Sequence, residues 1–86
     1  MIVGPVPASA KAAVVNVTSV DSTDPSFITV WPTGSPRPLA STLNPRPGAA
    51  VPNQAYLRLG TNGRLDAFNN AGSTNVIVDV FGYFTE

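Results

Sequence analysis

Apolar and polar residues alternate along most of this chain with the two-residue period of β-strands that bury one face. The pattern predicts strands over six ranges, which are 12–18, 26–31, 40–43, 54–59, 65–68 and 74–84. No eleven-residue stretch carries the 3.6-residue period of an amphipathic helix. The hydrophobic pattern therefore predicts an all-β protein.

The same alternation assigns side chains to the two faces of each predicted strand. The residues expected to point into the core are Ala13, Val15, Val17, Ile28, Val30, Leu57 and Leu59. The residues expected on the opposite faces are Phe27, Thr29, Trp31, Tyr56 and Arg58.

The last predicted strand has a different pattern. β-Branched residues dominate positions 74–80, and such residues lose side-chain freedom in a helix but pack well on a pleated sheet. Apolar side chains occur at even-numbered positions, such as Val78 and Val80, and at odd-numbered positions, such as Ile77 and Phe81, which point to opposite faces of a strand. This pattern indicates burial on both faces, so we expect the strand to lie inside the sheet system rather than at its rim.

Turn-forming residues separate the strands. Residues 21–25 combine Asp and Ser side chains that bond nearby amides with a Pro that fixes φ. The Asn-Gly pair in 60–63 predicts a hairpin in which 65–68 pairs back on 54–59. Six of the nine prolines lie in 32–52, which predicts long loops there.

These elements predict one domain over residues 1–86, a small antiparallel β-sandwich of jelly-roll-like or immunoglobulin-like form with no substantial helix. Pro5 and Pro7 are expected to keep the first residues extended. The chain has no Cys, so its small core is not supplemented by a disulfide.

The composition argues against several function classes. Five basic and five acidic residues balance, and Lys11 is the only lysine, so nucleic acid is not an expected partner. No apolar run approaches the roughly 20 residues that span a bilayer, so no membrane insertion is expected. The absence of His and Cys removes the Ser–His and Cys–His nucleophile arrangements, and no cofactor is expected.

Carboxylates are the remaining candidates for chemistry. Asp66 with Asp79, or Asp21 with Asp24, would have to form an acid–base pair. Asp66 is expected near solvent and Asp79 is expected to anchor a neighbour, so we predict no enzymatic activity. Asp21, Asp24 and Asn16 also offer oxygen ligands for Ca²⁺, but their spacing is not that of a known calcium loop. An ordinary turn is the preferred interpretation, and no metal site is predicted.

The leading candidate for a binding surface is the face opposite the core, with Phe27, Trp31, Tyr56 and Arg58. Trp, Tyr and Arg dominate protein–protein hot spots, and flat aromatic rings beside polar groups also stack on sugars. Three interpretations remain open: the second sheet or the loops cover this face, it contacts a protein, or it binds a glycan.

Arg37 and Arg46 each stand between two prolines. The stiff flanking residues leave little conformational entropy to lose on binding, which suits presentation to a partner. The alternative is that each guanidinium packs on a carbonyl or carboxylate of its own loop. A Pro-Arg-Pro loop entering a protease cleft is a weaker possibility.

Many residues spread over nearly the whole chain match a known kind of module in order and spacing. They are residues 6–7, 13–18, 28–34, 37–38, 41, 43–44, 47–48, 51–53, 60, 63, 72–74, 76–80 and 82–84. This set resembles the repeat module of actinobacterial secreted and cell-surface proteins, which often occurs in tandem or beside cell-wall hydrolases. The resemblance implies an extracellular or cell-surface location within a larger exported protein, and no activity is carried over from it.

Two departures from that module stand out. Its usual upstream segment, with a Leu-Asp-Thr-Arg-like motif, is absent, and Asn75 stands where Asp is common. If the upstream segment completes a sheet, this chain must leave an edge open or fill it from a neighbour. Open edges invite strand addition, so self-association is a physical hypothesis.

The sequence thus predicts a non-catalytic surface interaction module that binds a protein partner, a sister copy or a cell-wall or other extracellular glycan. The alternative is a self-assembling structural subunit, such as a virion decoration or fibre protein. The first seven residues lack a signal-peptide pattern, so both a module cut from an exported protein and a small protein of its own remain open.

Overall fold

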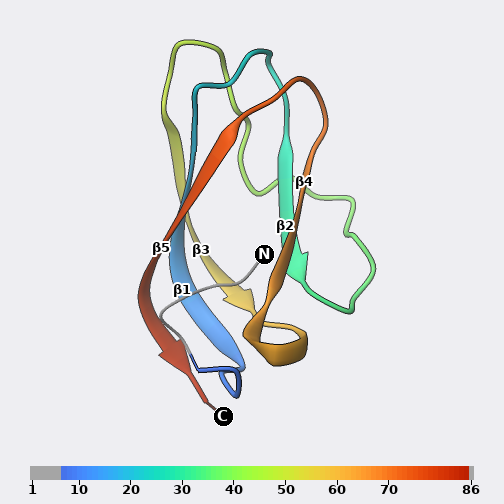
Figure 1. The fold of residues 1–86 in the computed structure, drawn as a ribbon, viewed down its shortest axis with the longest axis vertical. Helices are drawn as coiled ribbons and strands as arrows, with labels where there is room; N and C mark the ends of the chain where they lie inside the picture. Colours follow the sequence, from blue (N-terminus) through green and yellow to red (C-terminus); the bar gives the residue numbers. More distant parts are fainter. Residues whose placement is uncertain (1–6, 86) are drawn as a thin grey trace.

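The computed structural model describes residues 7–85, which form two small antiparallel sheets packed as a β-sandwich (Figure 1). The elements are β1 (Ala12–Val20), β2 (Ile28–Pro32), β3 (Val51–Arg58), the 3₁₀ turn η1 (Thr61–Gly63), β4 (Leu65–Asn69) and β5 (Asn75–Phe84). The all-β prediction is confirmed. The expectation for Pro5, and Val6 of the resemblance, lie outside the described residues.

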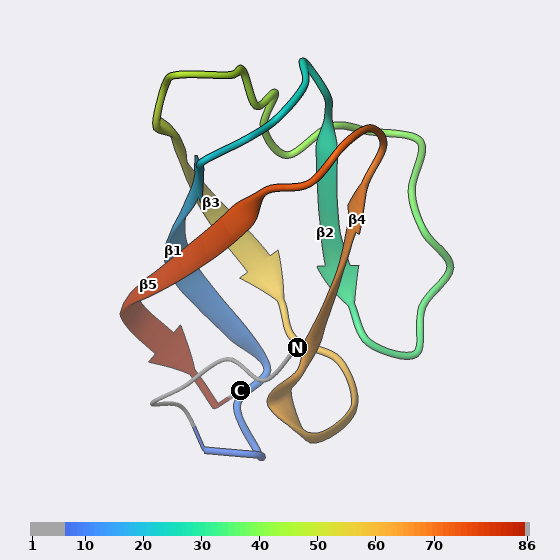
Figure 2. The same ribbon diagram turned by 45° about the horizontal axis from the view of Figure 1, so that its top comes forward.

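The chain changes sheet at every connection between strands. One sheet has the order β3-β1-β5 and the other the order β2-β4, so the odd and even strands are separated. Figure 2 shows the chain crossing from β1 to β2 and from β4 to β5 at the same end of the sandwich. Consequently, no strand in the described chain pairs with the strand that follows it in sequence.

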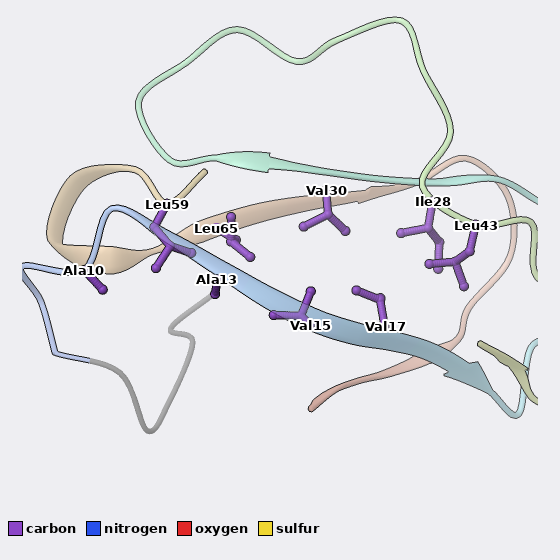
Figure 3. Packing of buried hydrophobic residues seen from close by; sticks show 9 residues of the cluster. All are labelled: Ala10, Ala13, Val15, Val17, Ile28, Val30, Leu43, Leu59 and Leu65. Carbon is purple, nitrogen blue, oxygen red and sulfur yellow. The ribbon is translucent and has the colours of Figure 1, made fainter. Parts of the chain in front are cut away.

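β1 is the centre of the three-stranded sheet, flanked antiparallel by β3 and β5. Its alternating residues Ala13, Val15 and Val17 are fully buried, as the sequence predicts. They meet β2 and β4 in a core that lies between the two sheets (Figure 3). The core cluster comprises Ala10, Ala13, Val15, Val17, Ile28, Val30, Leu43, Leu59 and Leu65.

The position of β5 corrects the sequence prediction. Within the described chain β5 pairs with β1 alone, so it lies at the edge of its sheet rather than inside it. Val76, Val78 and Val80 pack against the core, whereas Ile77 is exposed. The apolar residues at both parities therefore reflect one buried face and one apolar face open to solvent, not burial on two sides.

The predicted hairpin between 54–59 and 65–68 is wrong. Asn62 and Gly63 do adopt the positive φ angles of a tight turn, 58° and 69°. However, the turn carries the chain to the other sheet, where β4 pairs with β2. The Asn-Gly signal located the turn correctly, but a turn signal alone does not fix which strand the chain pairs with next.

The proline-rich segment forms loops, as predicted, but 40–43 is not a strand. Leu43 makes only an isolated bridge with Ile28. The Thr29 hydroxyl, on the side of β2 away from the core, donates a 2.7 Å hydrogen bond to the Ala40 carbonyl. The loop therefore covers part of the outer face of the two-stranded sheet, and Thr29 is buried.

Candidate interaction surfaces

Aromatic side chains gather on the outer face of the three-stranded sheet, on the side away from the core. Tyr56 of β3 lies across β1 from β5, opposite Val14, and is 64% exposed. Its ring centroid is 5.8 Å from that of Phe84 on β5, with the ring planes inclined at 55°. The two outer strands thus bring their aromatic rings together above β1.

A β-bulge places a further aromatic ring on β5. The register with β1 shifts between Val14 and Val15, which pair with Gly82 and Val80, so Phe81 is the extra residue. Phe81 is 67% exposed. Bulges commonly redirect a side chain at a sheet edge, and this one leaves a large apolar ring in solvent.

Ile77 lies farther along the solvent-facing side of β5, opposite Thr18 of β1, and is also exposed. We refer to Tyr56, Ile77, Phe81 and Phe84 as the outer apolar face. Single exposed apolar residues are ordinary, but several large ones near one another usually mark an interaction site.

The edge of β5 with which no described strand pairs borders this face. β5 is ten residues long, contains no proline and has Asp79 as its only charged residue. Natural edge strands are usually short, charged or interrupted by proline, since their unpaired N–H and C=O groups otherwise recruit another strand. β3, the opposite edge of the sheet, carries Pro52. The β5 edge is therefore the less protected of the two.

The predicted aromatic surface is divided between the two sheets, which corrects the sequence prediction. Tyr56 and Arg58 are on β3, and together with Lys11 they line a hollow of about 230 Å³. Trp31 is on β2 and Phe27 immediately precedes it, so both belong to the opposite side of the sandwich. The alternation predicted the outward direction of these side chains but not the sheet to which each strand belongs.

Phe27 instead joins Arg37 beside the proline-rich loop. The ring centroids of Phe27 and Phe68 are 6.0 Å apart, and the guanidinium carbon of Arg37 lies 3.9 Å from the Phe68 centroid. The neighbouring groove has a volume of about 360 Å³, and its lining residues are Phe27, Arg37, Pro38, Leu39, Ala40, Ser41 and Asn44.

The remaining two predicted site residues do not join either cluster. The Trp31 indole is half-buried, and its Nε1–H donates a 3.0 Å hydrogen bond to the Ser35 carbonyl, which ties the turn after β2 to the strand. Arg46 is exposed on its own loop, between Pro45, which is buried, and Pro47, which is exposed. The structure thus brings together Tyr56 with Arg58, and Phe27 with Arg37.

The carboxylates form no acid–base pair, and one of them, Asp79, lies on the solvent-facing side of β5 between Ile77 and Phe81. Asp66, on β4, accepts a 3.0 Å hydrogen bond from the Thr33 hydroxyl, whereas Asp79 is exposed on β5 in the other sheet. The Asn16 amide donates to the Thr18 hydroxyl at 3.0 Å. Within residues 7–85, no three His, Cys, Asp or Glu residues are close enough to hold a metal ion.

Sequence reasoning missed Phe68, Phe81 and Phe84 as surface residues. The signal for Phe81 and Phe84 was present, since the Phe-Gly-Tyr-Phe end of the last strand breaks its alternation, as a bulge does. Phe68 gave no such signal, because its role depends on a loop more than 20 residues away in sequence.

In the part of the chain that the structure describes, no helix is long and apolar enough to cross a membrane. Comparisons of this chain with protein-family models, curated proteins and solved structures found no match.

Proposed function

We propose that this protein is a non-catalytic interaction module whose outer apolar face and adjoining β5 edge bind protein, with a second copy of the chain as the first candidate partner. The observation that carries the proposal is the exposure of Tyr56, Phe81 and Phe84 beside an unprotected edge strand. The absence of His and Cys in the sequence supports a non-catalytic role.

A protein partner suits this surface better than a glycan. The Tyr56 and Phe84 rings are inclined to one another at 55°, so they form an uneven apolar surface rather than a flat platform. Trp31, the largest ring available for sugar stacking, is half-buried in the other sheet. Aromatic residues on an apolar surface are typical of the centre of a protein–protein interface.

The sequence of β5 also suits pairing with itself. In an antiparallel pair centred on Val78, Val76 would lie opposite the second copy's Val80, which extends the buried face of the sheet across the junction. Ile77 would lie opposite the second copy's Asp79, so the two carboxylates would not face one another. The zero net charge of the chain adds no overall repulsion between copies.

Sedimentation equilibrium over a roughly hundredfold range of protein concentration tests the proposal. We expect a dimer or larger species that dissociates on dilution. Phe81→Asp should weaken the association at least about tenfold, since it places a charge on the apolar face. Leu39→Asp is the matched control, because Leu39 is fully exposed on the loop beside the other sheet and should leave the association unchanged.

A monomer at every concentration would contradict self-association and leave only a different protein partner. Equal effects of the two Asp variants would show that the association does not use the outer apolar face.

A self-assembling structural subunit, such as a virion decoration or fibre protein, is the second candidate. It is favoured because the β5 edge and the adjoining outer apolar face offer two kinds of contact, strand pairing and packing of a sheet face, and each can be used by a different neighbour. In that case the molar mass should keep rising with concentration rather than level off at a dimer. The proposal of an interaction module includes an extracellular or cell-surface location, which the family resemblance implies.

A further inference from the structure

Arg37 holds its charged group over an aromatic ring and leaves its hydrogen-bonding edge unused. The guanidinium carbon is 3.9 Å from the centroid of Phe68. Within residues 7–85, Arg37 makes no hydrogen bond and no ion pair. A guanidinium stacked in this way keeps its five N–H donors in the plane of the group, where they remain available to an acceptor.

The position of Arg37 is restricted before any partner arrives. Pro36 and Pro38 fix φ on both sides of it, and the contact with Phe68 limits the side chain. Because little rotamer freedom remains to be lost, more of the hydrogen-bond energy to a bound anion would appear as affinity.

The groove beside Arg37 combines donors with an apolar wall. Asn44 lines the groove, and its Oδ1 already accepts a 2.9 Å hydrogen bond from the Ser41 hydroxyl. This bond uses the Oδ1 atom, so the N–H groups of the same Asn44 amide remain as hydrogen-bond donors. Phe27, Pro38 and Leu39 supply apolar surface, and none of the acidic residues that the structure describes lines the groove.

We propose that this groove binds a carboxylate on an acidic peptide segment, with an apolar neighbouring side chain against Phe27 and Leu39. Arg37 would bind the carboxylate through two parallel N–H···O bonds, a geometry that suits a planar two-oxygen acceptor. A phosphorylated segment is less suitable, because such groups are usually held by several arginines, and this groove has one.

A peptide fits the lining better than an acidic sugar does. The Arg37 guanidinium occupies a face of the Phe68 ring, so that face is closed to a sugar. Apart from Phe27, the apolar lining is aliphatic or proline, which favours an apolar side chain over a polyhydroxylated ring. The site is separate from the outer apolar face, so its test does not depend on the proposed self-association.

The test is an NMR titration of the ¹⁵N-labelled protein with acetyl-Leu-Asp-Leu-amide, using acetyl-Leu-Asn-Leu-amide as the neutral probe. We expect the Asp peptide to shift the backbone signals of Leu39, Ala40, Ser41 and Asn44 in a saturable way, and the Asn peptide to bind at least roughly tenfold more weakly.

Two arginine variants make a matched pair. Arg37→Gln should weaken binding of the Asp peptide roughly tenfold or more, whereas Arg46→Gln should leave it unchanged. Both substitutions remove one charge from an exposed arginine between two prolines, but only Arg37 lines the groove. Arg37→Lys keeps the charge but loses the planar pair of donors, so it should restore binding only in part.

Three results would overturn the proposal. One is equal binding of the Asp and Asn peptides, and another is equal loss of binding in the two Gln variants. The third is a larger response of the same signals to glucuronic acid than to the Asp peptide, which would identify a sugar site.

Discussion

Gly60, which follows β3, lies directly against the backbone of Thr33, which follows β2. A Cβ atom at position 60 would overlap the carbonyl oxygen and the amide nitrogen of Thr33. Two backbone hydrogen bonds join these segments, Thr61 N–H to the Thr33 carbonyl at 3.1 Å and Thr33 N–H to the Arg64 carbonyl at 3.2 Å. A third, from Gly60 N–H to the Arg64 carbonyl at 2.9 Å, closes the turn after β3. The crossing from β3 to β4 is therefore fixed to the end of β2.

We expect Gly60→Ala to lower the free energy of unfolding by about 3 kcal/mol, because the backbone that blocks the new methyl group cannot move without breaking these hydrogen bonds. Gly82→Ala is the control, since a Cβ there would meet no atom within 4 Å, and it should change the stability by less than about 1 kcal/mol. Urea unfolding followed by the fluorescence of the single tryptophan measures both. Similar values for the two variants would contradict the close approach of Gly60 and Thr33.

Ser19 in β1 and Ser22 just after β1 should respond differently to the same substitution. Ser19 is fully buried, and its hydroxyl has no hydrogen-bond partner among the described residues. We expect Ser19→Ala to leave the stability unchanged or to raise it by about 1 kcal/mol, because an unsatisfied buried hydroxyl is costly.

Ser22, by contrast, is 2.7 Å from the Thr74 hydroxyl, a contact that joins the β1–β2 and β4–β5 connections. Ser22→Ala should therefore lower the stability by about 1 kcal/mol in the same urea experiment. A loss of stability in Ser19→Ala as large as that in Ser22→Ala would contradict the prediction.

The two isoleucines of the sheets provide a test of which face is buried. Ile28 is 1% exposed in the core, while Ile77 is 47% exposed on the outer apolar face. We expect Ile28→Val to cost about 1 kcal/mol of stability and Ile77→Val to cost less than about 0.5 kcal/mol. A larger effect at Ile77 than at Ile28 in thermal unfolding would mean that the assigned faces of β2 or β5 are wrong.

If copies associate through the outer apolar face, thermal stability should depend on protein concentration. Association that occurs only in the folded state raises the melting temperature as the concentration increases. We expect this rise in the unmodified chain and in Leu39→Asp, and its absence in Phe81→Asp. Calorimetry at several concentrations measures it, and a concentration-independent melting temperature in the unmodified chain would count against self-association.

The strands and the core face of β1 could be predicted because alternation depends only on neighbouring residues. Ala13, Val15 and Val17 are buried as expected. The pairing of strands could not be predicted, since a two-residue period records which face is buried but not which strand lies alongside. For the same reason, Tyr56 and Trp31 were assigned to one surface although they lie on opposite sides of the sandwich.

The edge position of β5 was missed for a different reason. Apolar residues at both parities are shared by a strand buried on two faces and by an edge strand with an apolar surface, and the sequence alone does not distinguish them. The contact of Arg37 with Phe68 was beyond sequence reasoning as well, because it depends on where the proline-rich loop folds back.

The alternation of strands between the two sheets has a consequence for synthesis of the chain. β1 is made first, yet one neighbour is β3 and the other is β5, whose last residue is Phe84. A nascent chain that has reached only β2 can form none of the strand pairs of residues 7–85, and one that ends before residue 75 leaves the β5 side of β1 unpaired. The domain should therefore fold late, once β5 has been made, and nearly in a single step. Shortened chains should be bound by chaperones or degraded.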